Sequence, residues 1–275
     1  MAAGNLSPRQ KMINMMYLVL TALLALNVSK EVLQSFFEVN KGIERTTSNF
    51  NLKNSETYSA FNNAAENNPE KYQKVRDNAF EVRKKSAEVV MYLQEMKYEL
   101  VSAVDGGKVY LGKTLDVLDE DGKPIEDKVI IDKSFSDLTE NQKKSPIAWL
   151  KNKSNRDKSG SLFMPKNLGQ NKRKANILKN KITDYRDLLI SLVDSNQSLI
   201  DEINMVCDVS NKGSGKKLQT WEEYNFVDMP SVGALTILSK IQSDLTNLES
   251  EVINYLKRNI DAKSLKFSSA EGIAI

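Results

Sequence analysis

The chain has 275 residues, a length typical of one or two domains, and its composition excludes several classes of protein. It has no histidine, which excludes Ser-His-Asp and Cys-His catalysis and zinc sites built on histidine. The net charge is +3, of which residues 1–28 contribute +2 through Arg9 and Lys11. The nearly neutral remainder argues against a nucleic-acid-binding protein, which needs a basic face for phosphates. The single cysteine, Cys207, cannot form an intrachain disulfide.

Residues 12–28 form an apolar run without a charged side chain, flanked by Lys11 and Lys30. As an α-helix, the run rises about 25 Å, which approaches the thickness of the hydrocarbon core of a bilayer. The two lysines can extend the span by placing their ammonium groups among lipid headgroups. We expect Ser7 to cap this helix and Pro8 to occupy its first position.

Three interpretations of the apolar run compete: a cleaved signal peptide, a buried helix of a soluble protein, and an uncleaved signal anchor. The spacing of small residues that signal peptidase needs is missing, because a cut after Ala25 places Leu23 at the −3 position. We favour the anchor and assign residues 1–30 to a cytoplasmic N-terminus and a single transmembrane helix. The basic flank then keeps the N-terminus in the cytoplasm, and the rest of the chain is exported.

One face of the expected anchor helix is polar or small. At 100° per residue this face carries Gln10, Asn14, Tyr17, Thr21, Ala25 and Val28, and Arg9 lies on the other side. Polar groups that face lipid lack partners, so we expect a helix–helix contact along this face. The alternative is that Tyr17 and Thr21 are tolerated singly, with Thr21 bonded to its own helix.

Long helices are predicted for most of the remaining chain. Val32, Phe36, Val39, Ile43 and Phe50 indicate that the anchor helix continues outward, and Asn68-Pro69 ends it and starts the next helix. Three heptad-like apolar stripes follow, at Tyr72, Val75, Ala79, Val82, Ser86, Val89, Leu93, Met96 and Leu100; at Leu178, Ile182, Tyr185, Leu189, Leu192, Asn196, Leu199, Ile203 and Val206; and at Leu235, Leu238, Ile241, Leu245, Leu248, Val252 and Tyr255. This pattern predicts a mainly all-α fold, a bundle of long helices.

The bundle is expected over residues 31–265, with an irregular insert at about 106–169. Within the insert, "KTLDVLDEDGKPIEDKVIID" alternates weakly around Asp121-Gly122 and predicts a short β-hairpin. "NKSNRDKSGS" and "SNKGSGKK" are typical of polar loops. Residues 266–275 end in the apolar "EGIAI", which we interpret as the start of a following segment beyond Ile275.

Motifs for chemistry are weak. "KGSGKK" lacks the spacing and the Ser or Thr of a phosphate-binding loop, and "DEDG" lacks the ligand positions of a calcium loop. Most acidic residues alternate with lysines on helices, which is typical of a solvated face. We therefore expect no enzymatic activity, no catalytic residues, no metal site and no cofactor.

Two long stretches carry a resemblance to a known family. "LSPRQKMINMMYLVLTALLALNVSKEVLQSF" (6–36) and "WEEYNFVDMPSVGALTILSKIQSDLTNLESEVINYL" (221–256) resemble the GldM/PorM family of gliding motility and type IX secretion. The resemblance implies a homodimer with one transmembrane helix per subunit, set inside a ring of a multi-pass inner-membrane partner, GldL or PorL. It also implies that proton flow through this complex moves the periplasmic domains, which contact outer-membrane components of secretion and gliding.

The resemblance implies a role for Arg9, the arginine before the apolar run, in proton-driven motion. A proton-driven motor needs a titratable group in the membrane, and residues 12–28 contain none. The proton-carrying carboxylate is therefore expected in the partner, with Arg9 as its counter-ion and Tyr17 as a polar contact. Two other interpretations remain: Arg9 as a topology signal only, and the chain as a passive membrane-anchored scaffold or the ectodomain of a bitopic sensor.

Overall fold

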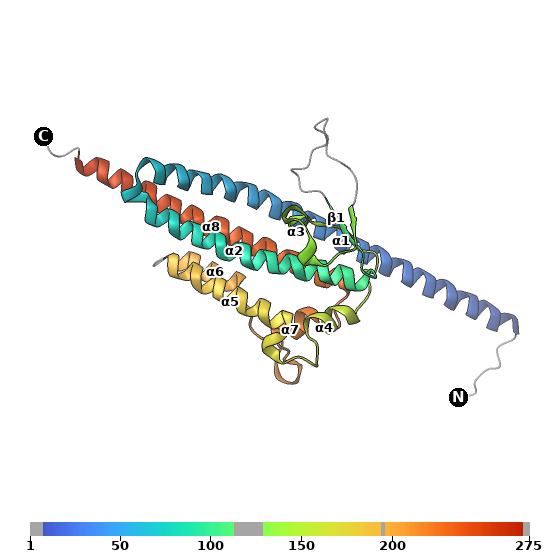
Figure 1. Cartoon of the computed structure of the whole chain (residues 1–275). Helices are drawn as coiled ribbons and strands as arrows, with labels where there is room; N and C mark the ends of the chain where they lie inside the picture. The colour runs from blue at the N-terminus through green and yellow to red at the C-terminus, as the bar shows by residue number, and fades with distance from the viewer. Residues whose placement is uncertain (1–7, 113–128, 194–195, 272–275) are drawn as a thin grey trace.

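The computed structural model describes residues 8–112, 129–193 and 196–271; within these ranges, the side chains of residues 8, 22–29, 129–130, 216 and 259–271 lie outside this description. The fold is mainly helical, as predicted, and three long helices dominate it (Figure 1). They are α1 (Pro8–Asn67), α2 (Pro69–Val104) and α8 (Ser231–Glu271). α1 and α8 are parallel to each other, and α2 is antiparallel to both. Each of the three helices packs on the other two.

The reversal between α1 and α2 follows the prediction at Asn68-Pro69. The Asn68 side chain accepts a hydrogen bond from the backbone N–H of Lys71, at 3.2 Å, and Pro69 occupies the first helical position. Such a cap stabilises a helix end by about 1 kcal/mol. At the other end of α1, Pro8 is also the first helical residue, whereas Ser7 lies outside the described residues.

Two of the three predicted apolar stripes lie in the core as expected. Leu93, Met96 and Leu100 of α2 are fully buried, as are Leu235, Leu238 and Leu248 of α8. The remaining stripe is divided between α5 (Lys174–Leu192) and α6 (Gln197–Val206), so the prediction of one continuous stripe is wrong there. Asn196 does not lie in the stripe, because its side chain caps α6 by accepting from the Leu199 N–H.

A small sheet and short helices fill the segment between α2 and α5. β1 (Val109–Leu111) pairs antiparallel with β2 (Val129–Ile131). β2 lies within the segment predicted to form a hairpin, residues 113–132, whereas β1 precedes it, and the expected turn at Asp121-Gly122 lies outside the described residues. β3 (Ile147–Trp149), which was not predicted, pairs antiparallel with the other edge of β1. The short helices are η1 (Phe135–Asp137), α3 (Glu140–Lys144), α4 (Asp157–Phe163) and η2 (Gln170–Lys172).

The prediction of a loop at residues 152–161 is wrong in its second half, which belongs to α4. The Asn155 side chain accepts from the N–H groups of Asp157 and Lys158, and Ser159 is buried and donates to the Phe226 carbonyl at 2.8 Å. The loop at residues 210–217 is confirmed, apart from the turn η3 (Gly215–Lys217). Gly213 and Gly215 there have φ of +92° and +56°, which glycine adopts without strain. α7 (Trp221–Phe226) then leads into α8.

Candidate functional site

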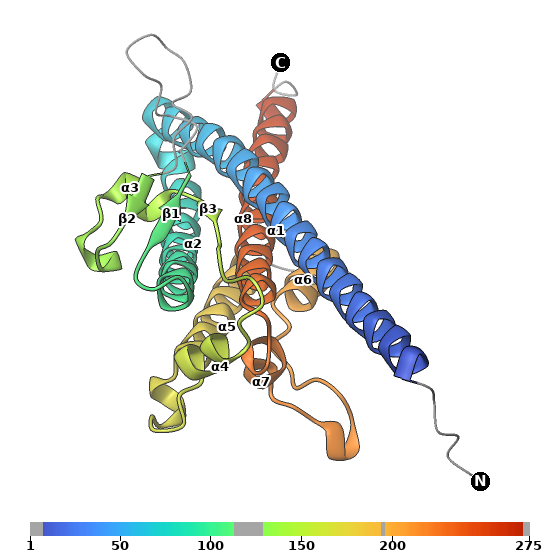
Figure 2. The same ribbon diagram turned by 90° about the vertical axis from the view of Figure 1, so that its right-hand side faces the viewer.

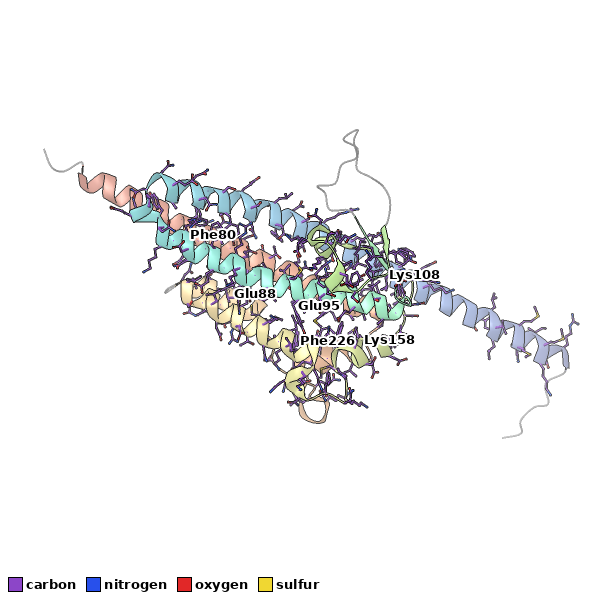
Figure 3. All side chains as sticks on the ribbon, viewed as in Figure 1. Phe80, Glu88, Glu95, Lys108, Lys158 and Phe226 are labelled. Atoms are coloured by element: carbon purple, nitrogen blue, oxygen red, sulfur yellow. The ribbon has the colours of Figure 1, made fainter. Side chains whose placement is uncertain are left out.

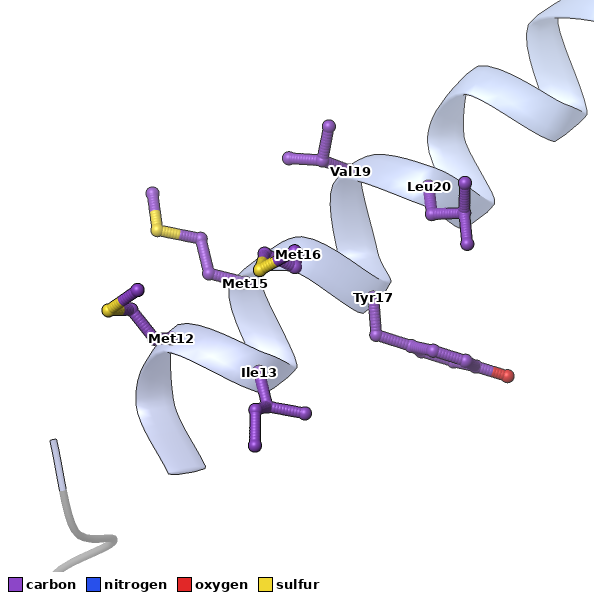
Figure 4. A pocket seen from close by; sticks show the side chains of 7 residues that line it. All are labelled: Met12, Ile13, Met15, Met16, Tyr17, Val19 and Leu20. Atoms are coloured by element: carbon purple, nitrogen blue, oxygen red, sulfur yellow. The ribbon is translucent and has the colours of Figure 1, made fainter. Parts of the chain in front are cut away.

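The N-terminal part of α1 projects from the end of the bundle, with apolar side chains on all sides (Figures 1 and 4). Its large apolar residues are each between 49 and 70% exposed: Met12, Ile13, Met15, Met16, Tyr17, Leu18, Val19 and Leu20. They surround one helix and do not enclose a cavity (Figure 4). An apolar surface of this extent marks a place where protein or lipid binds.

No helix that is long and apolar enough to cross a bilayer is found in the part of the chain that the structure describes. The apolar run of the sequence continues past Thr21 into residues 22–29, whose side chains fall outside that description.

The residues predicted to act in the anchor lie on this projecting part of α1. Arg9, Lys11, Asn14, Tyr17 and Lys30 are exposed there, as are Gln10 and Thr21, whereas the side chain of Ala25 is not described. The Thr21 hydroxyl lies 2.9 Å from the carbonyl oxygens of both Tyr17 and Leu18, so it is bonded to its own helix. A helix–helix contact along this face therefore stays a prediction.

The helix enters the bundle at an aromatic cluster around Phe37. This ring is fully buried and packs edge-to-face on Trp149 of β3, with 5.9 Å between ring centroids. The Lys153 ammonium lies 3.8 Å from the centroid of Trp149 and 5.1 Å from that of Phe37. Burial lowers the pKa of Lys153. Aromatic and cation–π contacts of this kind attach α1 to the bundle at the point where its projecting N-terminal part begins.

Beyond this cluster, the surface between α1 and α8 is unusually polar for a bundle core. Asn40, Thr47 and Asn54 of α1 are buried. The facing residues of α8 are also buried and polar: Ser239, Gln242, Ser243, Thr246, Glu249 and Ser250. The Asn54 amide donates to the Thr246 carbonyl at 3.3 Å and its oxygen accepts from Ser250 at 2.5 Å. We call these residues the polar seam.

An ion pair lies at one end of the polar seam. The fully buried Lys97 of α2 is 2.6 Å from a carboxylate oxygen of Glu44, whose side chain is 12% exposed. Ser239 of α8 donates to the same oxygen at 2.9 Å. The pair therefore joins α1, α2 and α8, and its charges need each other because a single buried charge is costly.

A second buried carboxylate, that of Glu249, lies farther along the polar seam. It accepts hydrogen bonds of 2.6 Å from the Tyr58 hydroxyl of α1 and from the Ser86 hydroxyl of α2. Burial is the main cause that raises the pKa of Glu249, and the two hydroxyl donors and Arg83 oppose it. Burial and the Glu249 charge together raise the pKa of Tyr58 and of the neighbouring Tyr185.

Neither Lys97 nor Glu249 was predicted to be special. The signal was present in the sequence, because Lys97 lies within the stripe between Leu93 and Leu100, and Glu249 directly follows the stripe residue Leu248. A charged residue at the edge of an apolar face is normally read as solvent-exposed, and only its three-dimensional neighbours show that it is paired.

Glu44, Lys97, Asn54 and Glu249 connect helices through an ion pair and hydrogen bonds, whereas the Asn40 amide and the Gln242 side-chain oxygen have no hydrogen-bond partner among the described residues. Within the described residues, no cluster of His, Cys, Asp and Glu has the makeup of a metal site. Cys207 is buried, and burial raises the pKa of its thiol to about 12, which disfavours a reactive thiolate. The ion pair and the hydrogen bonds of Glu249 and Asn54 join α1 to the other long helices.

Comparison with known proteins agrees with this description. A family model described as the GldM N-terminal domain matches residues 31–121 and 133–259, most of the chain. The chain therefore belongs to the GldM family, a membrane-associated component of gliding motility and type IX secretion that is not known as an enzyme. A search of curated proteins found no match.

Proposed function

We propose that the chain is a non-enzymatic subunit of an inner-membrane motor driven by the proton motive force. In this proposal, the part of α1 before Lys30 is the single transmembrane anchor and residues 31–265 form the periplasmic domain. The partner is a multi-pass protein of the GldL type, which carries the titratable carboxylate. Motion of α1 relative to that partner drives protein secretion and gliding through outer-membrane components.

The continuity of α1 carries the proposal. One helix of 60 residues extends from Pro8 to Asn67, so the exposed apolar end and the α1 residues of the polar seam lie on the same continuous helix. At 1.5 Å per residue such a helix is about 90 Å long. Any rotation or tilt imposed on its N-terminal end is passed to the bundle at Phe37 without an intervening hinge.

A second copy of the chain is the proposed partner along the outward part of α1. Val32, Phe36 and Val39 were predicted to follow the extension of the anchor helix, and the helix does continue there. Their side chains nevertheless remain between 48 and 55% exposed in the single chain. They recur every three to four residues on one face, which favours pairing with the same face of another helix.

The role of Arg9 in the motor can be tested separately from its role in assembly with the partner. A guanidinium beside a partner carboxylate favours its ionised form, so losing the guanidinium raises the pKa of that carboxylate and slows proton release. We expect Arg9→Ala to assemble with the partner but to fail in secretion and gliding, and Arg9→Lys to recover partly. Lys11→Ala is the matched control and should keep secretion. Near-normal secretion by Arg9→Ala at normal protein levels would leave Arg9 as a topology signal.

Replacing the anchor distinguishes a motor from a passive scaffold. Residues 12–28 are exchanged for an alternating Leu-Ala helix of equal length, with Arg9, Lys11 and Lys30 retained. A scaffold needs only an apolar span and keeps secreting, whereas a motor needs Asn14, Tyr17 and Thr21 against its partner. We expect the exchanged chain to insert in the membrane and to lose secretion.

A further inference from the structure

The basic residues of the chain are concentrated in one stretch of the sequence. Residues 143–181 contain twelve basic residues and one acidic residue, Asp157, so the rest of the chain is net negative. The near-neutral total therefore conceals a strong local asymmetry. Such a concentration of one sign of charge attracts an oppositely charged surface.

The fold divides these basic residues into two groups. Some are paired with carboxylates of the bundle: Lys143 with Glu140, Lys174 with Glu95 and Glu99, and Lys179 with Glu222. Others point outward from the loop after β3, from α4 and from the connection between α4 and α5. Of these, Lys151, Arg156, Lys158, Lys166 and Lys172 are exposed and Arg173 is half-buried. We call these six residues the basic end surface.

Local contacts hold the basic end surface in place, and none of its six residues forms an ion pair within the described part of the chain, although the Asp105 carboxylate lies close to Lys151. The Asp105 carboxylate is bound by the backbone N–H groups of Lys151 and Asn152, at 2.8 and 2.9 Å. Arg156 donates to the Asp228 carbonyl at 3.2 Å, and the Arg173 Nε donates to the Leu168 carbonyl at 3.1 Å. Backbone carbonyls carry no formal charge, so the two guanidinium charges remain.

The basic end surface faces the side from which the anchor projects. In Figures 1 and 2, α4, α7 and the turn η2 all lie at the end of the bundle from which the N-terminal part of α1 emerges. Figure 3 shows Lys158 at this end as well. From Lys30, the expected headgroup boundary, to Phe37, where α1 meets the bundle, the helix rises about 10 Å. The bundle therefore begins about 10 Å beyond the expected headgroup boundary, a distance comparable to the Debye length of about 8 Å at physiological ionic strength.

We propose that the basic end surface docks on anionic phospholipid headgroups of the bilayer that holds the anchor. The proposal rests on the anchor of the proposed function. Each lysine or arginine near an anionic membrane strengthens the association on the order of fivefold. The bundle is then attached to the membrane both by α1 and by the basic end surface, and the two attachments together fix its orientation. Motion of the partner would release or restore the contact of the basic end surface with the headgroups.

The test uses the full chain in lipid nanodiscs, in a Cys207→Ala background. Spin labels are placed at Ser161, an exposed residue of α4; at Ser59, an exposed residue in the distal part of α1; and at Leu18 of the anchor. Discs contain either phosphatidylcholine alone or a mixture with phosphatidylglycerol. A lipid with a nickel-chelating headgroup reports how close each label comes to the headgroups, and dissolved oxygen reports burial of Leu18 in the hydrocarbon core.

We expect the Ser161 label to approach the headgroups in anionic discs only, and the Ser59 label in neither. Replacing Lys158, Lys166 and Lys172 by glutamate should weaken the anionic-lipid association by more than about a hundredfold, because the loss of three positive charges alone gives that factor. Charge reversal at Lys53, Lys74 and Lys84, which are exposed elsewhere on α1 and α2, is the matched control and should leave it unchanged.

Three results would overturn the proposal. Equal approach of the Ser161 label in neutral and anionic discs would remove the charge dependence. Approach that appears only when the multi-pass partner is present would assign the surface to a protein. Loss of approach on adding inorganic phosphate at constant ionic strength would assign it to a free anion. A Leu18 label outside the hydrocarbon core would instead refute the anchor, and the docking with it.

Discussion

Two parts of α1 differ in how hydropathy relates to burial. Residues 9–21 are mostly apolar and exposed, whereas residues 37–65 place Asn40, Thr47 and Asn54 on the buried face beside Phe37 and Tyr58. A helix in water normally buries its apolar stripe and exposes its polar one. This difference indicates that the two parts of α1 suit different surroundings. Residues 9–21 suit a partner or lipid, and residues 37–65 suit a neighbouring helix with polar side chains.

Several groups of the polar seam are satisfied by hydrogen bonds to one another, whereas the Asn40 amide and the Gln242 side-chain oxygen are buried without a partner among the described residues. Burying a polar group without a partner costs a few kcal/mol, and a satisfied one costs little. Glu249 and Asn54 both have hydrogen-bond partners on other helices. Because hydrogen bonds are directional, such an interface fixes the register of α1 on α8 more closely than an apolar one does. This register suits a helix that passes motion into the bundle.

The largest expected effect comes from placing a charge in the core of the second region. Leu93 is fully buried. Leu93→Asp buries a carboxylate without a partner, so we expect a loss of more than about 4 kcal/mol and a chain that does not fold. Lys84→Asp, an exposed position of the same helix, should have little effect. Circular dichroism melting checks both, and a normal melting curve for Leu93→Asp would show that the assigned core face of α2 is wrong.

The next effect concerns the ion pair of the polar seam. Lys97→Met leaves Glu44 nearly buried without its cation, so we expect a loss of about 3–5 kcal/mol in the free energy of unfolding. The double variant with Glu44→Leu should recover most of this loss, because it leaves no single charge in the core. Urea denaturation measures both variants. If Lys97→Met costs less than 1 kcal/mol, the pair is not desolvated as described.

A smaller effect is expected at Glu249, and it depends on pH. The pKa of Glu249 is raised above its ordinary value of 4.5, so the folded state binds the proton more tightly and stability falls as the pH rises through the raised pKa. Glu249→Gln removes this loss. Above that pKa we expect the variant to be more stable than the wild type, and the two to converge at lower pH.

Glu251→Gln is the control for this experiment, because Glu251 is exposed on the same helix. It should show no such pH-dependent difference from the wild type. Urea denaturation across the pH range measures both variants. A Glu249→Gln chain that is less stable than the wild type at every pH would mean that the charged carboxylate is what Tyr58 and Ser86 require.

The smallest effect on folding is expected at the outward apolar face of α1. Phe36 is about half exposed, so Phe36→Ser should change the stability of the single chain by no more than about 0.5 kcal/mol. It should nevertheless weaken the dimer. Leu52→Ser, which removes another exposed apolar side chain of the same helix, should leave the dimer intact. Sedimentation equilibrium in detergent compares them, and an unchanged Phe36→Ser dimer would place the contact elsewhere.

Much of the fold was predictable because helix caps and apolar stripes are local. Asn68-Pro69 ended one helix and began the next, and the stripes of α2 and α8 lie in the core. β3 and the polar seam were not predictable, because they depend on contacts between residues far apart in the sequence. The Glu44–Lys97 pair, for example, joins two helices that a reading by periodicity treats separately.

The most direct test of the continuous α1 is a pair of insertions between Lys30 and Glu31. One variant receives a seven-residue helical insertion rich in alanine and glutamate, which adds about two turns and nearly preserves the facing of the helix. The other receives seven residues of glycine and serine, which break the helix into two independent parts. We expect both chains to insert and to bind the partner, the helical insertion to keep substantial secretion, and the flexible one to lose it. Equal secretion by the two variants would contradict the proposal that α1 passes motion from the membrane to the bundle.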